Sequence, residues 1–132
     1  PTRRVDAFDY DVDTGDVSNR RTVIALPEGI GDPDGMCIDE EGGLWVALWG
    51  GGAVHRYDGT RLDAVVDVPT PYVTCPAFVG PHGEDLVVTT ASEPFGDDAP
   101  VDAGDLYVVR PGVSGPAPAR VDLERVASRP DR

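Results

Sequence analysis

Asp34 is the residue whose type and setting best suit chemistry in this chain. It lies in the run Asp32-Pro33-Asp34-Gly35, where Pro and Gly predict a tight turn, and a short apolar strand follows at once. A carboxylate on such a turn can coordinate a hard divalent cation or accept a proton from water. The same four residues also form ordinary Asx-Gly turns without a chemical role. The turn alone leaves both interpretations open.

Aromatic and acidic residues in the longer connections are a second group of candidates. Trp49, Tyr72 and Phe95 lie between expected strands, and the segment 91–104 also carries an acidic pair at residues 97–98. Aromatic rings can wall a small polar pocket, and a segment of this length can cover one as a lid. We therefore treat the three aromatic residues as candidate substrate-pocket residues. Exposed loop residues that cover the end of a sheet are the alternative.

Other reactive residues lack the spacing of the common catalytic and metal motifs. The acidic run 9–16 has no Gly or Glu at the sixth and twelfth positions of an EF-hand loop, so a solvated hairpin turn is expected. No CxxC, HxxxH or GxSxG pattern occurs. We expect the two His and two Cys to be structural or solvent-facing: Cys37, His55, Cys75 and His82.

Composition excludes several classes of partner. The 132 residues include 24 acidic and 11 basic side chains, all of the latter Arg, for a net charge of −13. Nucleic acid is not an expected partner, because its phosphates require a basic patch. No apolar run reaches the roughly 20 residues of a membrane span. We expect a cytoplasmic protein of one domain with reduced cysteines.

Short β-branched and aromatic runs recur about every ten residues, which predicts an all-β protein with very little helix. We expect nine strands, at Arg4–Tyr10, Arg20–Leu26, Gly35–Asp39, Leu44–Ala47, Ala53–Tyr57, Leu62–Val68, Val73–Val79, Leu86–Thr90 and Asp105–Val109.

The connections between these strands are of two kinds. Short Gly- and Asp-rich turns alternate with longer connections at 27–33, 48–52, 69–72 and 91–104. In an antiparallel meander alternate connections fall at the same end of the sheet, so the long ones share one end. A ligand site is expected at that end.

Three motifs in the chain resemble those of the gluconolactonase, regucalcin (senescence marker protein) and luciferin-regenerating enzyme family. They are PDGMCID at 33–39, GxLWVA at 42–47 and GGxVxRYD at 51–58, and the similarity spans roughly residues 3 to 115. The resemblance implies a β-propeller, which in this family has six blades. The strand at Asp34 would be the innermost of one complete blade.

Two strands before that blade and three after it give about two and a quarter blades, a partial six-bladed propeller from the carboxy-terminal part of the family pattern. We assign residues 1–115 to this domain and 116–132 to a Pro/Ala/Arg-rich tail whose last ten or so residues are frayed. A partial propeller leaves strand edges and blade faces uncovered. Self-association, or a missing amino-terminal half, is therefore expected.

The resemblance also implies a function. The family pattern makes Asp34 a ligand of a divalent cation, Ca²⁺, Zn²⁺, Mn²⁺ or Mg²⁺, and a possible general base. A metal-activated water would attack the carbonyl of a small-molecule sugar lactone. The family's other ligands, a Glu and Asn residues in EGP-type and PNG-type motifs, are absent, and Asn19 is the only Asn. A non-catalytic, cation-binding or degenerate propeller module, incomplete without its first half, is the alternative.

Overall fold

The structure is a computed structural model that describes residues 2–119, apart from the side chain of Phe95. Nine strands and one short 3-10 helix, η1 (Glu93–Asp98), make up its regular structure. The strands are β1 (Arg4–Tyr10), β2 (Val17–Ala25), β3 (Asp32–Ile38), β4 (Leu44–Trp49), β5 (Ala53–Asp58), β6 (Arg61–Asp67), β7 (Val73–Val79), β8 (Asp85–Thr90) and β9 (Leu106–Val109).

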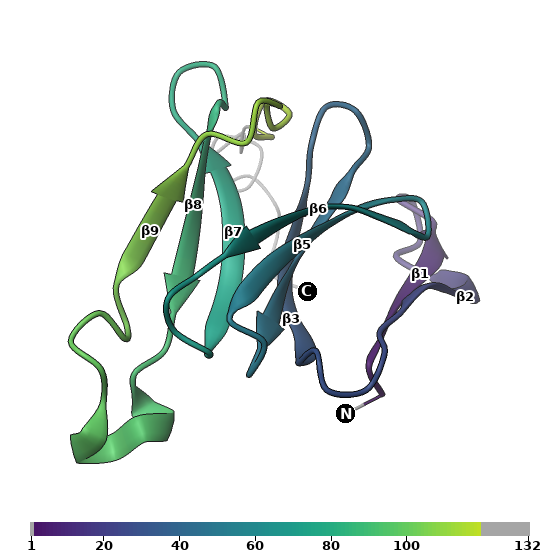
Figure 1. The fold of residues 1–132 in the computed structure, drawn as a ribbon. Coiled ribbons are helices and arrows are strands. Elements are labelled where there is room, and N and C mark those ends of the chain that lie inside the picture. The colour runs from purple at the N-terminus through teal and green to yellow at the C-terminus, as the bar shows by residue number, and fades with distance from the viewer. Residues whose placement is uncertain (1, 120–132) are drawn as a thin grey trace, which may run out of the picture.

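The strands form three antiparallel sheets in chain order. They are β1-β2, then β3-β4-β5-β6, then β7-β8-β9 (Figure 1). Each strand pairs with its neighbour in sequence, so the chain is a continuous meander divided into two, four and three strands. The all-β prediction is confirmed, and so is the division into one complete blade with part of a blade on either side.

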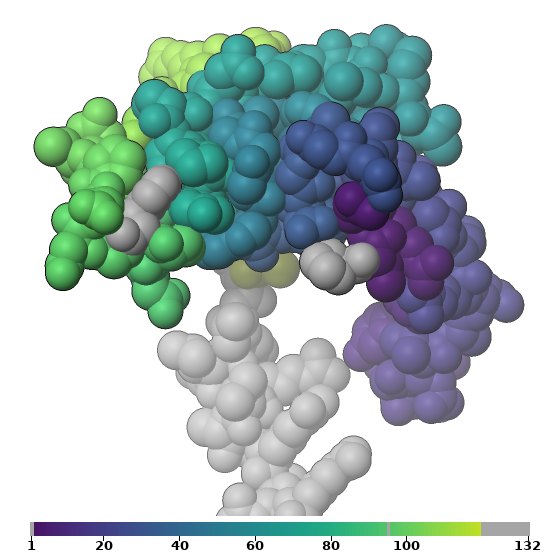
Figure 2. All heavy atoms as spheres, turned by 60° about the horizontal axis from the view of Figure 1, so that its bottom comes forward, coloured from purple at the N-terminus to yellow at the C-terminus, as the bar shows by residue number. Residues whose placement is uncertain are grey.

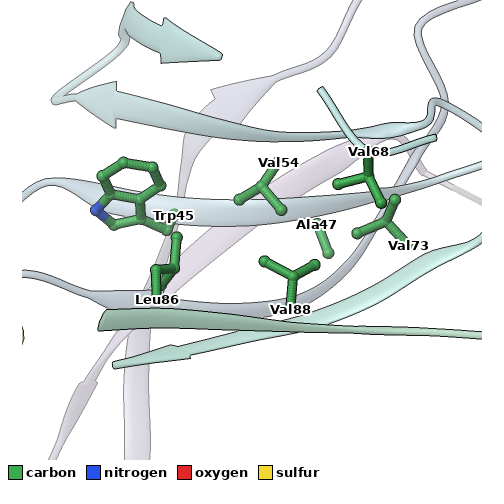
Figure 3. Close-up of a cluster of buried hydrophobic side chains, with 7 residues drawn as sticks. All are labelled: Trp45, Ala47, Val54, Val68, Val73, Leu86 and Val88. Carbon is green, nitrogen blue, oxygen red and sulfur yellow. The ribbon is translucent and has the colours of Figure 1, made fainter. Parts of the chain in front are cut away.

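β4 is the most deeply buried strand because a sheet covers each of its faces. Trp45 and Ala47 point to one side, where they pack with Val54 against Leu86 and Val88 of β8. Figure 3 shows these side chains facing one another across the two sheets. This double burial explains why β4 reads as the continuous apolar run LWVALW instead of alternating with polar residues.

The opposite face of β4 packs against the two-stranded sheet. Val46 and Leu48 of β4 meet Val5 of β1, Ile24 of β2 and Leu26, which directly follows β2, in a second core cluster. Strands β1 and β2 therefore belong to the fold in spite of being only a pair, because they bury one face against the four-stranded sheet.

Among residues 2–119, apolar side chains on β3 and on β9 remain exposed. Met36 and Ile38 on β3 are 43% and 50% exposed, although their register partners on β4 lie on the face that packs against β1 and β2. Leu106 and Val108 on β9 are about two-thirds exposed. The third sheet thus has an open face, and the covering of β3 by the first sheet is incomplete.

Strand boundaries differ from the predictions mainly at β2 and β3. β3 begins at Asp32 instead of Gly35, because Asp32 and Pro33 pair with Trp49 and Leu48. The prediction that Asp34 lies on a turn before the strand is therefore wrong. Pro33 is compatible with a strand at this position because β3 is an edge strand.

The division of the chain at residue 115 remains a prediction. Residues 116–119 form no regular structure, and the rest of the predicted tail, 120–132, lies outside the described residues. Within residues 2–119 no helix is long and apolar enough to cross a membrane.

Candidate functional site

The long connections gather at one end of the sheets. Figure 1 shows the segments that follow β2, β4, β6 and β8 at the lower end, with the β3-β4 and β7-β8 hairpins at the upper end. Figure 2 turns that lower end toward the reader, with the segment around η1 on one side and β1 and β2 on the other. The start of β3, which carries Asp34, belongs to this end.

Asp34 lies in a β-bulge. Pro33 pairs with Leu48 and Met36 pairs with Val46, so Asp34 and Gly35 together stand opposite the single residue Ala47. The extra residue reverses the inside-outside alternation of β3 and disrupts the ladder locally. Bulges of this kind re-aim side chains next to functional sites. The local sequence allows it because Pro33 cannot donate to the ladder and Gly35 tolerates a close neighbour.

The carboxylate of Asp34 is exposed and unpaired. Within residues 2–119 it makes no hydrogen bond or ion pair. Other carboxylates of the chain are held by Arg side chains, as Asp6 is by Arg20 and Asp9 by Arg21. A rigid strand position with a free carboxylate can bind a ligand without first breaking an internal contact.

Gly35 fixes the neighbouring strand against this position. A Cβ on Gly35 would stand 2.6 Å from the carbonyl oxygen of Thr74 and 2.7 Å from Sγ of Cys75. β3 and β7, the first strands of two successive sheets, are therefore in near-backbone contact next to Asp34. Only Gly fits at this position.

Asp32 is a candidate that the sequence reasoning did not single out. It lines a hollow of about 290 Å³ together with Arg3, Gly29, Gly31 and Gly50, at the start of β3. The Asp-x-Asp spacing with Asp34 was the available signal, since it places two carboxylates within one short stretch of strand.

Trp49 and Tyr72, two of the three predicted pocket residues, are brought together. Their ring centroids are 4.8 Å apart at an interplanar angle of 44°, and the two residues form an isolated β-bridge. Both are half-buried. Trp49 also pairs in register with Asp32, so this aromatic pair adjoins the start of β3.

The predicted lid contains η1, and its two ends are tied to the third sheet. The amide of Ala91 donates to the carbonyl of Tyr72 at 2.9 Å, and the amide of Gly104 donates to Oγ1 of Thr90 at 3.0 Å. Phe95 lies within η1 together with Asp97. Figure 1 shows η1 projecting at the lower corner beneath β8 and β9, apart from β3.

The residues present do not form a complete cation site. No group of three or more His, Cys, Asp or Glu side chains within the described part of the chain could hold a metal ion. Ca²⁺ takes six to eight oxygen ligands, and Mg²⁺ requires near-octahedral coordination. Asp34 can supply one or two oxygens, so other ligands would have to come from elsewhere.

The cysteines and Asp39 have structural environments. Both thiols are free. Burial raises the pKa of Cys37 to about 12, and Cys75 and Asp39 contribute smaller effects in the same direction. Cys37 is therefore not a thiolate nucleophile at neutral pH.

Asp39 is buried at the far hairpin end, where it accepts hydrogen bonds from Nε of Arg56 at 2.7 Å and from Nε1 of Trp45 at 2.8 Å.

Asp39 and Arg56 form a buried ion pair. Burial raises the pKa of Asp39, but hydrogen bonds from Arg56, Trp45 and the Gly43 amide outweigh it and leave the pKa below its usual value. Arg56 also bonds Glu41 and Asp63, so its charge is fully compensated. Sequence reasoning missed this pair, whose members lie 17 residues apart: Asp39 directly follows β3, and Arg56 lies on β5.

Comparison with known proteins places these features in a family. The family model described as the SMP-30/Gluconolactonase/LRE-like region matches residues 1–92, which include the bulged strand and the whole four-stranded sheet. The chain belongs to this family. Regucalcin of Homo sapiens is 44% identical over 121 residues, covering 86% of this chain, and a protein of Sulfolobus acidocaldarius is 44% identical over 117 residues, covering 87%.

Solved structures of SMP-30/gluconolactonase/LRE-like proteins share the fold. A luciferin-regenerating enzyme matches with a TM-score of 0.76 at 38% identity over 88% of this chain, and a calcium-binding regucalcin from Agrobacterium tumefaciens matches with a TM-score of 0.76 at 35% identity over 87%. The chain covers 40% of each of the two relatives above and 41% of each solved chain. It is therefore a partial β-propeller relative to these proteins.

Proposed function

We propose that this chain is part of a hydrolase of sugar lactones, with Asp34 as its contribution to the reacting centre. Asp34 accepts the proton of the water that attacks the lactone carbonyl and returns it to the ring oxygen as the ring C–O bond breaks, which releases an open hydroxy acid. Asp34 also serves as one oxygen ligand of a divalent cation. The remaining ligands come from outside the described residues.

One observation carries this proposal: a partnerless, exposed carboxylate lies on a β-bulge of the first strand of a complete blade, at the long-connection end. The bulge and the Gly35 contact hold the backbone at Asp34 rigidly, as a general base requires. The Trp49–Tyr72 pair adjoins the same strand start and offers aromatic surface against which a sugar ring can pack.

A non-catalytic cation-binding function is the second candidate. It is favoured because a matching solved protein is named as a calcium-binding regucalcin. In that case Asp34 would bind the cation without turning over a lactone.

Cation binding by Asp34 is tested on the chain itself, with Mn²⁺ as a paramagnetic probe. Titration of the ¹⁵N-labelled chain should broaden amide signals around residues 32–36 before other regions. Asp34→Asn should remove this effect. Asp13→Asn, an exposed carboxylate in the β1-β2 hairpin, is the matched control and should retain it.

The test of hydrolase activity needs a complete propeller, which is obtained by joining this chain to the missing blades of a relative. Gluconolactone hydrolysis, followed in a pH-stat, should be lost in Asp34→Ala and kept in Asp13→Ala. Mn²⁺ binding without lactone turnover would favour the second candidate. Full turnover in Asp34→Ala would rule out both roles of Asp34.

A further inference from the structure

A second cavity lies between the end of β2 and the β5-β6 hairpin. Its volume is about 320 Å³, which falls at the lower limit of the range for small-molecule pockets. Its lining is largely apolar and none of it belongs to β3: Ala25, Pro27, Ile30 and Leu62, with the polar His55, Tyr57 and Thr60.

All seven residues that line this cavity lie within the described part of the chain. In the order β3-β4-β5-β6, the strands β5 and β6 are the outer pair of their sheet, and β2 belongs to the neighbouring sheet that packs on it. The cavity walls therefore do not include the uncovered parts of β3 or of β9. Unlike the centre at Asp34, this site does not depend on protein residues from outside the chain to contact a bound compound.

His55 and Tyr57 form a hydrogen-bonded pair in the cavity wall. Nδ1 of His55 lies 3.1 Å from the hydroxyl oxygen of Tyr57, and both residues lie on the same side of β5, two positions apart. Tyr57 is only 6% exposed. Its side chain is thus almost entirely covered, and its hydroxyl is paired with His55 in a mainly apolar wall.

The pair can offer one donor and one acceptor at once. Burial lowers the pKa of His55, with Asp67 acting in the opposite sense, and burial raises the pKa of Tyr57, so both are neutral at pH 7. If the Tyr57 hydroxyl donates to Nδ1, the hydroxyl oxygen keeps a lone pair and Nε2 carries a hydrogen. In the other tautomer the hydroxyl donates outward and Nε2 accepts.

We propose that this cavity binds a small neutral ring compound that carries a hydrogen-bond donor and an acceptor side by side, as an aromatic amide does. The apolar residues hold the ring, and the His55–Tyr57 pair matches the amide. Anions are disfavoured because no Arg lines the cavity and the chain carries a net charge of −13.

Benzamide is the probe, with binding followed by amide chemical shifts of the ¹⁵N-labelled 132-residue chain. Saturable shifts are expected at residues 24–30 and 55–62. Tyr57→Phe keeps the ring but removes the hydroxyl, so affinity should fall about three- to tenfold, the value of one hydrogen bond. Tyr10→Phe, at an exposed position, is the matched control and should bind as the parent does. Ala25→Trp should fill the cavity and abolish the shifts.

Two comparison probes test the chemistry. Acetophenone has the ring and the acceptor but no donor, and it should bind several-fold more weakly than benzamide; benzoate should not bind. Retained dispersion of the amide spectrum confirms that each variant is folded. The proposal is overturned if benzamide gives no saturable shifts at these residues, or if its affinity is unchanged in both Tyr57→Phe and Ala25→Trp.

Discussion

Gly35 and Cys75 bring two blades into near-backbone contact. A Cβ on Gly35 would stand 2.7 Å from both Cβ and Sγ of Cys75, closer than such atoms approach in folded proteins. β3 can therefore lie against β7 only because residue 35 has no side chain. Since Asp34 precedes it in the same bulge, this contact also determines where the carboxylate is held.

Gly35→Ala should consequently lower the free energy of unfolding by about 2 kcal/mol, because an added methyl group must push two strands apart. Urea denaturation measures the loss. Gly59→Ala is the control: Gly59 has a positive φ of +58°, which strains an Ala, but nothing lies within 4 Å of a Cβ there, so it should lose only about 1 kcal/mol. A smaller loss for Gly35→Ala than for Gly59→Ala would mean that β3 and β7 are not tightly packed.

The order and type of the strands could be predicted from the sequence because they depend on local information. Alternating apolar residues and Gly-containing turns are visible in any short window. The bulge was missed for the same reason: Pro33-Asp34-Gly35 is a good turn sequence, and only the pairing of Asp32 and Pro33 with β4 makes it a strand. The pairing partner lies outside the window.

The candidate site shows the same limit. Trp49 and Tyr72 were predicted to share an end of the fold, and they are in contact. The closeness of Gly35 to Cys75 and of Asp39 to Arg56 could not be predicted, because the two members of each pair are separated in the chain by at least one whole strand. Hydrophobic periodicity gives the face that a residue occupies, but it does not give the residue opposite it.

Asp39→Asn should destabilise the chain by about 3 kcal/mol, since it breaks a buried ion pair and weakens the acceptor for Trp45 and the Gly43 amide. Urea denaturation at pH 7 checks this. Asp13→Asn in an exposed turn should change stability by less than about 0.5 kcal/mol. Equal stability of the two variants would show that Glu41 and Asp63 alone suffice to hold Arg56.

Stability should also depend on pH through Asp39. Its pKa in the folded chain is below the ordinary value of 3.8, so the unfolded chain binds more protons as the pH falls through about 4. The stabilisation is present above that pH and is lost progressively as the pH approaches the folded pKa. Denaturation curves between pH 7 and pH 2.5 should show a steeper acid loss for the parent than for Asp39→Asn. Parallel curves would contradict this.

Asp97→Ala tests the lid in the completed propeller. Asp97 lies in η1, whose loop is tied to the third sheet at both ends, and η1 projects apart from β3. The substitution should raise KM for gluconolactone several-fold. The broadening of amide signals near residue 34 by Mn²⁺ should remain unchanged. Asp102→Ala, in the same loop but outside η1, serves as control. Loss of Mn²⁺ binding in Asp97→Ala would instead make Asp97 a cation ligand.

The 132-residue chain on its own should self-associate through the open face of the third sheet. Leu106 and Val108 are exposed on β9, whose outer edge is unpaired among the described strands, and such edges and faces favour pairing with a second copy. The net charge of −13 opposes association, and this repulsion is screened less at low salt. Light scattering should therefore show a larger mass at 0.5 M NaCl than at 0.05 M NaCl.

The double variant Leu106→Lys with Val108→Lys should give a monomer at both salt concentrations. Val101→Lys, at a 96% exposed position in the loop, should associate as the parent does. A parent chain that stays monomeric at high salt would show that this apolar face is stable in water without a partner.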